Sequence, residues 1–319
     1  MIYFFSFILA FLLSVTLSKY LVKLLSKYSI VDTPKERSNH NVATPRGGGL
    51  ALVITTIILL LVYYYINNTV TVLYVIASLF IVATISFLDD LISLPITPRI
   101  ILQLISILIL LNGFTFKFDP INTLIITSTM FLFINFYNFM DGIDGSAASE
   151  AMHISISILV ISCLTDKIPH EVQFTALILI SACAGFLIFN WFPAKIFLGD
   201  VGSIALGLIC GWMLISLVLH GYVAAAIIIP LYYIADSSIT LLKRFFRGKK
   251  IWQAHSEHFF QKAVRKGASH AQVTKKIIAV NLILFVLSIV SLYYPGTSIV
   301  IASGVVAMLL YDLQRQRHC

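Results

Sequence analysis

The feature that most constrains this chain is a series of long, nearly uncharged apolar runs that recurs along the whole sequence. A helix that crosses a bilayer needs about 20 mostly apolar residues. The runs that meet or approach this length are residues 2–22, 48–66, 70–88, 99–112, 121–139, 147–164, 172–189, 204–219, 223–242, 277–293 and 297–311. The sequence therefore predicts an all-α integral membrane protein, a single polytopic membrane domain over residues 1–319. We expect eleven transmembrane helices, or ten if the short run 99–112 does not cross.

The composition excludes a water-soluble globular domain. Hydrophobic residues make up 59% of the chain and charged residues 11%, whereas a soluble domain has about 45–50% apolar and about 25% charged residues. The formal net charge of +8 would suit a nucleic acid partner, but the cations cluster between the apolar runs. Membrane orientation explains this clustering better, so we expect no nucleic acid partner.

The distribution of Lys and Arg predicts how the chain is inserted. One group of connecting segments comprises residues 26–46, 89–98, 140–146, 190–203, 243–276 and the C-terminal tail, and the other comprises 67–69, 113–120, 165–171, 220–222 and 294–296. Of the 22 Lys and Arg residues, only Lys117 and Lys167 fall in the second group. Because cytoplasmic loops retain cations, the first group is predicted to be cytoplasmic and to form the active site. The N-terminus is then periplasmic and the C-terminus cytoplasmic.

The first cytoplasmic segment combines cations with a run of glycines. Lys35, Arg37, His40 and Arg46 suit a phosphate-rich ligand. Residues 47–49 are glycines at the start of a helix, where a ligand can approach the backbone and free N–H groups can bind an anion. The alternative is a topological role, in which the cations anchor the chain and the glycines only soften a helix start.

Two segments carry paired acids beside the membrane. Asp89 and Asp90 directly follow an apolar run, and adjacent carboxylates there repel each other unless a cation such as Mg²⁺ lies between them. The alternative is a solvated pair at a helix end. Asp141 and Asp144 each precede a glycine, and with Asn138 they form an oxygen-rich patch. Tight glycine turns let both carboxylates point inward, whereas a plain turn would need only one Asp-Gly pair.

The later segments supply more polar groups. Asp200 and Ser203 belong to a Gly-Asp-x-Gly-Ser string just before an apolar run, and Lys195 upstream can neutralise a phosphate. An ordinary glycine turn with a capping side chain is the alternative. His255 and His258 would share one face of a helix, but their spacing is not that of the HExxH zinc motif. Histidines that position a phosphate fit better than zinc, with a solvated basic loop as the rival.

One carboxylate lies away from these strings. Asp236 falls inside the apolar run 223–242, and an ionisable residue within a span is a functional candidate by default. Its partner cannot be identified from the sequence. Transporters place such residues near the midplane, whereas here only Asp236 and Glu150 enter the apolar runs. The distribution favours an enzyme at the membrane boundary over a lipid or sugar transporter.

In their order along the chain, the strings resemble those of the polyprenyl-phosphate N-acetylhexosamine-1-phosphate transferases, the glycosyltransferase family 4 enzymes that include MraY and WecA. The similarity covers most of the chain. It comprises His40 with the Thr-Pro-x-Gly-Gly string, the Asp89-Asp90 pair, Asn-Phe-Met-Asp-Gly-Ile-Asp-Gly at 138–145, Gly-Asp-Val-Gly-Ser at 199–203, and His255 with His258. The string at 138–145 is the most specific of these.

This resemblance implies transfer of a sugar-1-phosphate from a UDP-N-acetylhexosamine to undecaprenyl or another polyprenyl phosphate, with release of UMP. It also implies Mg²⁺, with Mn²⁺ as a substitute, a place in the bacterial inner membrane among its lipids, and compatibility with a homodimer. One member of the Asp pair, most often argued to be the second, would deprotonate or hold the lipid phosphate, and Asp144 resembles a uridine-side residue. By position, the metal site is assigned to Asn138, Asp200, Asp89 and Asp90.

The full set of expected site residues follows from the strings and the resemblance. The catalytic candidates are Asp89, Asp90, Asp141, Asp144, His255 and His258. The substrate-binding candidates are Lys35, Arg37, His40, Arg46, Asn138, Asp144, Lys195, Ser203 and His270.

The histidine segment departs from MraY, which has three successive histidines where this chain has His255-Ser-Glu-His258 and later His270. This form resembles the branch that initiates O-antigen, in lipopolysaccharide, or other surface polysaccharides. Members of that branch use donors such as FucNAc or QuiNAc, and sometimes GlcNAc. WecA-type transfer from UDP-GlcNAc and MraY-type transfer in peptidoglycan synthesis are the alternatives. Single displacement and a route through an aspartyl-phosphate both stay open.

Overall fold

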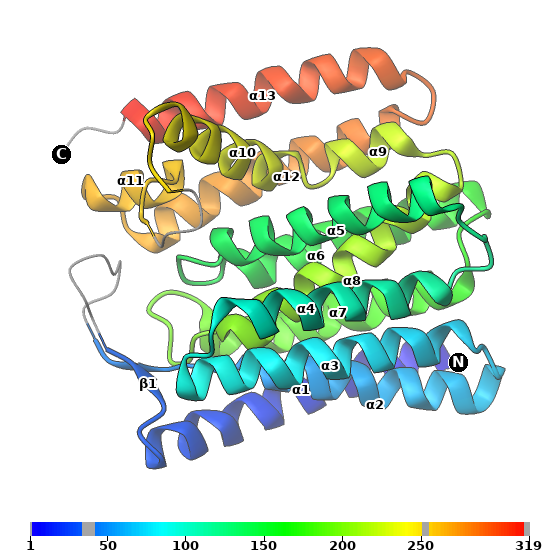
Figure 1. The fold of residues 1–319 in the computed structure, drawn as a ribbon, viewed down its shortest axis with the longest axis horizontal. Coiled ribbons are helices and arrows are strands. Elements are labelled where there is room, and N and C mark those ends of the chain that lie inside the picture. Colours follow the sequence, from blue (N-terminus) through cyan, green and yellow to red (C-terminus); the bar gives the residue numbers. More distant parts are fainter. Residues whose placement is uncertain (1, 34–41, 251–254, 316–319) are drawn as a thin grey trace.

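The computed structural model describes residues 2–33, 42–250 and 255–315, which form an almost entirely helical bundle (Figure 1). The helices are α1 (Ile2–Lys27), α2 (Gly49–Asn67), α3 (Thr71–Ile92), α4 (Ile96–Asn112), α5 (Pro120–Met140), α6 (Ser146–Thr165), α7 (His170–Asn190), α8 (Gly199–Leu219), α9 (Val223–Ile228), α10 (Leu231–Phe246), α11 (Phe259–Arg265), α12 (His270–Val290) and α13 (Pro295–Arg315). Two short antiparallel strands, β1 (Val31–Asp32) and β2 (Thr44–Pro45), lie between α1 and α2. The predicted all-α architecture is confirmed.

Nine helices in the described part of the chain are long and apolar enough to cross a membrane: α1, α2, α3, α5, α6, α7, α8, α12 and α13. The chain is therefore a multi-pass membrane protein. The short run expected as the fourth span forms α4, of 17 residues. The run 223–242 is divided between α9 and α10, so the prediction of one continuous helix there is wrong. The count of eleven spans stays a prediction, because it depends on α4 and on the α9–α10 pair.

The break between α9 and α10 has a local cause at Pro230. Proline has no N–H group, and its ring obstructs the preceding helical turn. The carbonyl oxygen of Ile229, the residue before the proline, is contacted by Nε2 of His153 from α6, at 3.0 Å. The N–H of Ile234 then donates to the oxygen of Pro230 at 3.1 Å. The chain thus starts a new helix, α10, which carries Asp236.

Two segments predicted as loops are partly helical, and their helical parts contact each other. α3 continues through Asp89 and Asp90, so the predicted loop 89–98 is reduced to the three residues between α3 and α4. α8 starts at Gly199, so Asp200 and Ser203 lie in its first turns and not before the helix. The side chain of Asp90 accepts the first N–H groups of α8, and this contact between distant segments stabilises both helix ends.

The glycines that precede α2 pack against the start of α8, whose residues are almost all buried in the middle of the bundle (Figure 1). A Cβ atom on Gly49 would lie 2.2 Å from the Cα atom of Gly202. The N–H groups of Gly48 and Gly49 donate to the carbonyl oxygens of Phe197 and Leu198, at 2.9 and 2.8 Å. The prediction that these N–H groups are free to bind an anion is wrong, because the glycines serve the approach of two backbones.

Candidate active site

The segments that carry the candidate residues meet at one end of the bundle, the end at which β1 and α11 lie in Figure 1. They surround a cleft of about 380 Å³. The structure brings together around this cleft Arg46, Asn138, Asp141, Asp144, Asp200, His255 and His270.

Other candidates do not line the cleft, namely Asp89, Asp90, Lys195, Ser203 and His258. Of these, Lys195 is exposed at the surface, whereas the rest contact residues that face the cleft or lie next to it. Three further candidates, Lys35, Arg37 and His40, lie outside the described residues.

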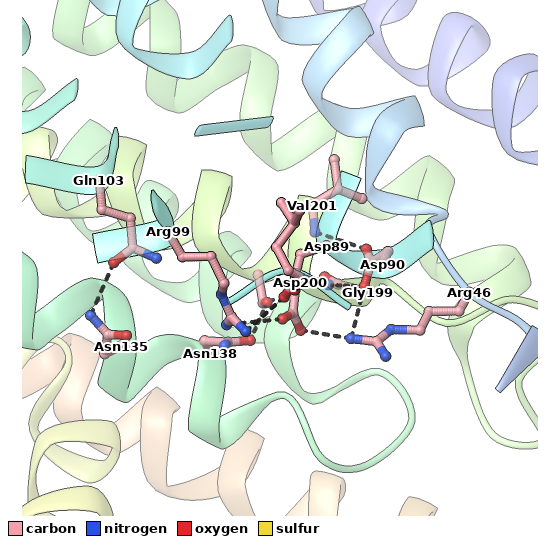
Figure 2. A network of polar contacts seen from close by, with 12 residues as sticks. Arg46, Asp89, Asp90, Arg99, Gln103, Asn135, Asn138, Gly199, Asp200 and Val201 are labelled. Carbon is pink, nitrogen blue, oxygen red and sulfur yellow. Dashed lines mark hydrogen bonds and ion pairs between the residues drawn. The ribbon is translucent and has the colours of Figure 1, made fainter. Parts of the chain in front are cut away.

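Asp200 lies between two arginines from different helices or loops, as Figure 2 shows. Its Oδ1 is 2.9 Å from Nη2 of Arg46, and its Oδ2 is 3.5 Å from Nη2 of Arg99. Each arginine also contacts one acid of the adjacent pair, Arg46 with Asp90 and Arg99 with Asp89, both at 2.8 Å. The positive charge that two adjacent carboxylates require is thus supplied in this structure by arginine.

Asp90 fixes the position of Asp200. The Asp90 side chain is fully buried and accepts hydrogen bonds from the N–H groups of Asp200 and Val201, at 3.2 and 3.1 Å. These N–H groups have no partner within α8 because they belong to its first turn. Gly199 precedes them with φ of +75°, and a Cβ atom there would lie 2.7 Å from Oδ2 of Asp90. Only glycine lets the carboxylate approach so closely.

Arg99 was missed as a site residue because it begins the predicted run 99–112 and was counted only as a topological cation. It contacts Asp89, which also accepts the N–H of Leu94 at 2.7 Å. One turn along α4, Gln103 is buried and accepts a hydrogen bond from Asn135 at 3.3 Å. The signal in the sequence was a single arginine, Arg99, that follows the Asp89-Asp90 pair after a short connection.

Asn138 and Asp200 both offer oxygen atoms at the cleft. The hydroxyl of Ser203 donates to Oδ1 of Asn138 at 2.6 Å, so Ser203 orients the amide from behind. Carboxylate and amide oxygens match a hard divalent cation in kind. Within the described ranges, however, no three His, Cys, Asp or Glu side chains are grouped so that they could hold a metal ion. Asp89 and Asp90 contact arginines instead.

The turn between α5 and α6 presents two acids in different environments. Asp144 is buried, accepts the N–H of Ala194 at 2.9 Å and lies 3.0 Å from Nδ1 of His270. Burial, and secondly the charge of Asp200, raise the pKa of Asp141 to about 8. The raised pKa favours the protonated form of Asp141, which can donate a hydrogen bond to an anionic ligand.

The two histidines of the HSEH string differ in exposure to the cleft. His255 lines it, and burial, followed by the neighbouring His258, lowers the pKa of His255 to about 4. A neutral imidazole has one nitrogen that can accept a proton or a hydrogen bond. His258 is 2% exposed, and its ring stacks on that of His255 with centroids 5.0 Å apart.

A second cavity of about 270 Å³ is lined by apolar side chains of α5, α8 and the broken α9–α10 pair. Its wall includes Pro230, where the helix breaks, and Phe136 of α5. Phe136 is two residues before Asn138, which lines the polar cleft. The apolar cavity therefore approaches the level of the cleft along α5.

The fold and the site define a membrane-spanning protein with a polar cleft at one end and an apolar cavity beside it. Residues 72–218 match the glycosyl transferase family 4. A probable undecaprenyl-phosphate N-acetylglucosaminyl 1-phosphate transferase of Bacillus subtilis (strain 168) is 25% identical over 97% of this chain and 89% of its own length. A phospho-N-acetylmuramoyl-pentapeptide-transferase of Wolbachia sp. subsp. Brugia malayi (strain TRS) is 28% identical over 90% of this chain and 97% of its own.

A further phospho-N-acetylmuramoyl-pentapeptide-transferase, from Clostridium beijerinckii, is 32% identical but covers 50% of this chain and 47% of its own length. Over residues 72–218 the chain is thus similar to glycosyl transferase family 4, and over most of its length it is similar to transferases of the polyprenyl-phosphate N-acetylhexosamine-1-phosphate class. The resemblance seen in the motifs is thereby confirmed.

Proposed function

We propose that this protein transfers an N-acetylated sugar-1-phosphate from a UDP-sugar to undecaprenyl phosphate, or a related polyprenyl phosphate, and releases UMP. The observation that carries the proposal is the polar cleft beside an apolar cavity, with Asn138 facing one and Phe136 lining the other. The two substrates differ in the same way, because the donor is a water-soluble pyrophosphate and the acceptor is a hydrocarbon chain with a phosphate head. The names of the relatives support this reaction class.

The reaction is a displacement at phosphorus. An oxygen of the lipid phosphate forms a bond to the phosphorus that carries the sugar, and the bond from that phosphorus to the UMP oxygen breaks. The electron pair of the broken bond leaves with UMP. All reacting groups are anionic, so the main requirement is neutralisation of charge in fixed positions.

Residues of the cleft meet this requirement in part. Arg46 lines the cleft and brings a positive charge to it, and protonated Asp141 can donate a hydrogen bond to a phosphate oxygen. Asp90, which the resemblance links to the lipid phosphate, is buried next to Arg46. We assign Asp90 to holding Arg46 and Asp200 in place.

We further propose that Mg²⁺, or Mn²⁺ in its place, is bound by Asp200 and Asn138. The bound ion would neutralise charge on the donor pyrophosphate. Asp200 supplies the charged ligand and sits at the start of α8, where Asp90 fixes it. Asn138 supplies a neutral oxygen that Ser203 orients. Asp89 and Asp90 pair with Arg99 and Arg46, the two arginines that also contact Asp200.

The apolar cavity is the proposed place for the acceptor chain. It is lined by Met130, Phe133, Leu214, Val218, Ile227 and Ile234, among others. We propose that the polar cleft faces the cytoplasmic side of a bacterial inner membrane. The reason is that the cations of the chain gather in the segments at that end.

The donor side is proposed to lie along Asp144, which His270 and the N–H of Ala194 hold in place. The HSEH form of the histidine string favours the branch that initiates O-antigen or another surface polysaccharide, with FucNAc, QuiNAc or GlcNAc as the sugar. The Bacillus relative is named for N-acetylglucosamine, so UDP-GlcNAc belongs among the first donors to test.

The rival function, transport of a lipid or sugar, requires ionisable groups along a path through the membrane. The two acids inside the apolar runs are both engaged in other contacts. Asp236 contacts His258, and Glu150 accepts a hydrogen bond from Asn281 at 2.7 Å. Both acids are therefore engaged within the protein, which favours an enzyme over a transporter.

The deciding experiment uses purified protein in detergent with undecaprenyl phosphate, Mg²⁺ and a panel of UDP-N-acetyl sugars. We expect UMP release with at least one donor, no release without the lipid, and loss of release with EDTA. Mass spectrometry of the lipid product identifies the sugar. Absence of UMP across the whole panel would rule out the proposed transfer.

A further inference from the structure

Asp236 is a buried carboxylate that the proposed reaction does not use. Its side chain is fully buried in α10, and it does not line the cleft. A charge in such a place is costly unless donors surround it. Two donors belong to α10 itself, the hydroxyls of Tyr232 at 3.3 Å and Thr240 at 3.2 Å. The others come from the segment that begins α11.

This segment contacts the carboxylate at three points. Nδ1 of His258 lies 3.1 Å from Oδ1 of Asp236, and the N–H of Phe259 donates to the same oxygen at 3.1 Å. The N–H of Phe260 donates to Oδ2 at 3.4 Å. A carboxylate oxygen accepts hydrogen bonds, so in a hydrogen bond between these two side chains Nδ1 of His258 is the donor. One side chain thus fixes both the first turn of α11 and the orientation of an imidazole ring.

The His258 ring connects Asp236 to the cleft. It stacks on the His255 ring, with centroids 5.0 Å apart and an angle of 22° between the planes. His255 and Ser256 line the cleft, whereas His258 lies behind them. Glu257, between these residues, is paired with Arg244 of α10 and, at 2.9 Å, with Lys249. The short segment therefore has two fixed points, Glu257 and His258, shortly after His255.

We propose that Asp236 and His258 form a positioning pair that holds His255 against the phosphate groups of the donor. Neither member touches substrate, and the pair acts through the stacked ring and through the start of α11. The identity of the donor rests on the proposed function, but the contacts do not.

The first test measures the contacts without activity. Hydrogen exchange, followed by mass spectrometry, compares wild type with Asp236→Asn and with Glu150→Gln in the same detergent. Asn cannot accept through its amide nitrogen, so residues 255–266 should exchange faster in Asp236→Asn. Glu150 is an equally buried carboxylate with its partner Asn281 on α12, and its variant should leave this segment unchanged. Unchanged exchange in Asp236→Asn would overturn the proposal.

The second test asks whether Asp236 acts through His255. UMP release is measured for Asp236→Asn, His255→Ala and the double variant. We expect a loss of about 10-fold in kcat for Asp236→Asn and no further loss when it is added to His255→Ala, because residues that act as a unit are not additive. Losses that multiply would show that Asp236 does not work through His255.

Two additions keep the result decisive. Asp236→Glu retains the charge and both acceptor oxygens, so it should restore more activity than Asp236→Asn, and it replaces that variant in the cycle if the amide form does not fold. A wild type that releases no UMP would end the proposed function, while the exchange experiment would still decide whether the pair positions the segment.

Discussion

Asp200 is held at the cleft by groups from three separate parts of the chain. Arg46 and Arg99 contact its carboxylate, and Asp90 accepts its backbone N–H. Burial, and secondly the charge of Asp200, raise the pKa of Asp141 nearby.

Replacing Asp200 by Asn should abolish turnover while the protein stays folded. The amide can still accept hydrogen bonds from arginine, but it lacks the charge that the proposed metal ion requires and that balances two guanidinium groups. We expect a loss of about 100-fold or more in kcat, the scale seen when one preorganised electrostatic group is removed. The control is Asp312→Asn, an exposed acid paired with Lys276 at 2.6 Å, which should retain activity. Near-normal turnover of Asp200→Asn would remove Asp200 from the metal site.

Asp141 makes stability depend on pH. Its pKa is raised from 3.8 to about 8 in the folded protein, so between these values the folded state holds a proton that the unfolded chain has released. Its contribution to the free energy of unfolding is present below about pH 4 and declines as the pH rises toward 8. Melting temperatures of wild type and Asp141→Asn, measured from pH 5 to 8 with EDTA, should diverge, with wild type losing more. Parallel curves would contradict the assignment.

At the scale of helices, the site depends on where α2, α3 and α8 meet. Asp90 at the end of α3 accepts the first N–H groups of α8, and glycines let α2 approach the same turn. The breaks and caps at these ends decide which side chains face the cleft. The interruption at Pro230 lies in the wall of the neighbouring apolar cavity.

Gly49→Ala should separate α2 from α8. The new methyl group would lie 2.2 Å from Cα of Gly202 and 2.9 Å from the oxygen of Leu198, and neither backbone can yield cheaply. We expect a destabilisation of about 1–3 kcal/mol and reduced activity, measured by thermal unfolding in detergent and by UMP release. Gly304→Ala is the matched control, because a Cβ atom in that position of α13 has nothing within 4 Å. Equal stability of the two variants would contradict the close helix contact.

For the whole molecule, the arrangement of the helices places the cation-rich segments at one end. α1 begins at the opposite end from the cleft, and α13 ends on the same side as the cleft (Figure 1). This placement agrees with an odd number of crossings. The side of the membrane that each end faces is a separate matter, and it follows from the distribution of cations.

Cysteine labelling tests the orientation in a variant without the four native cysteines. Asn68→Cys and Phe118→Cys, in connections at the far end, should react with a membrane-impermeant reagent from the periplasmic side. Gln314→Cys, at the end of α13, is the control that should react only after the membrane is opened. The reverse pattern would overturn the predicted topology.

The apolar runs were sufficient to predict an all-α membrane protein, because lipid leaves a spanning backbone few options besides the helix. The acids, glycines and histidines of the motifs were sufficient to indicate an anionic reaction at a membrane boundary. Local patterns could not show that Asp89 and Asp90 lie inside α3, or that residues 223–242 form two helices. The end of α3 depends on capping contacts from distant segments. The break in 223–242 depends on Pro230 and on the side chains packed around it.

The sequence therefore predicted the active-site segments, which are the polar connections from the paired acids to the histidine string. Only the tertiary structure decided which of these residues face the cleft and which hold others in position. Asp200 faces the cleft, Asp90 holds it from behind, and Asp236 holds His258 from a helix that no motif includes. The physical reason is that a hydrogen bond between distant segments depends on distances that only packing sets, whereas apolar length and charge distribution are properties of the chain itself.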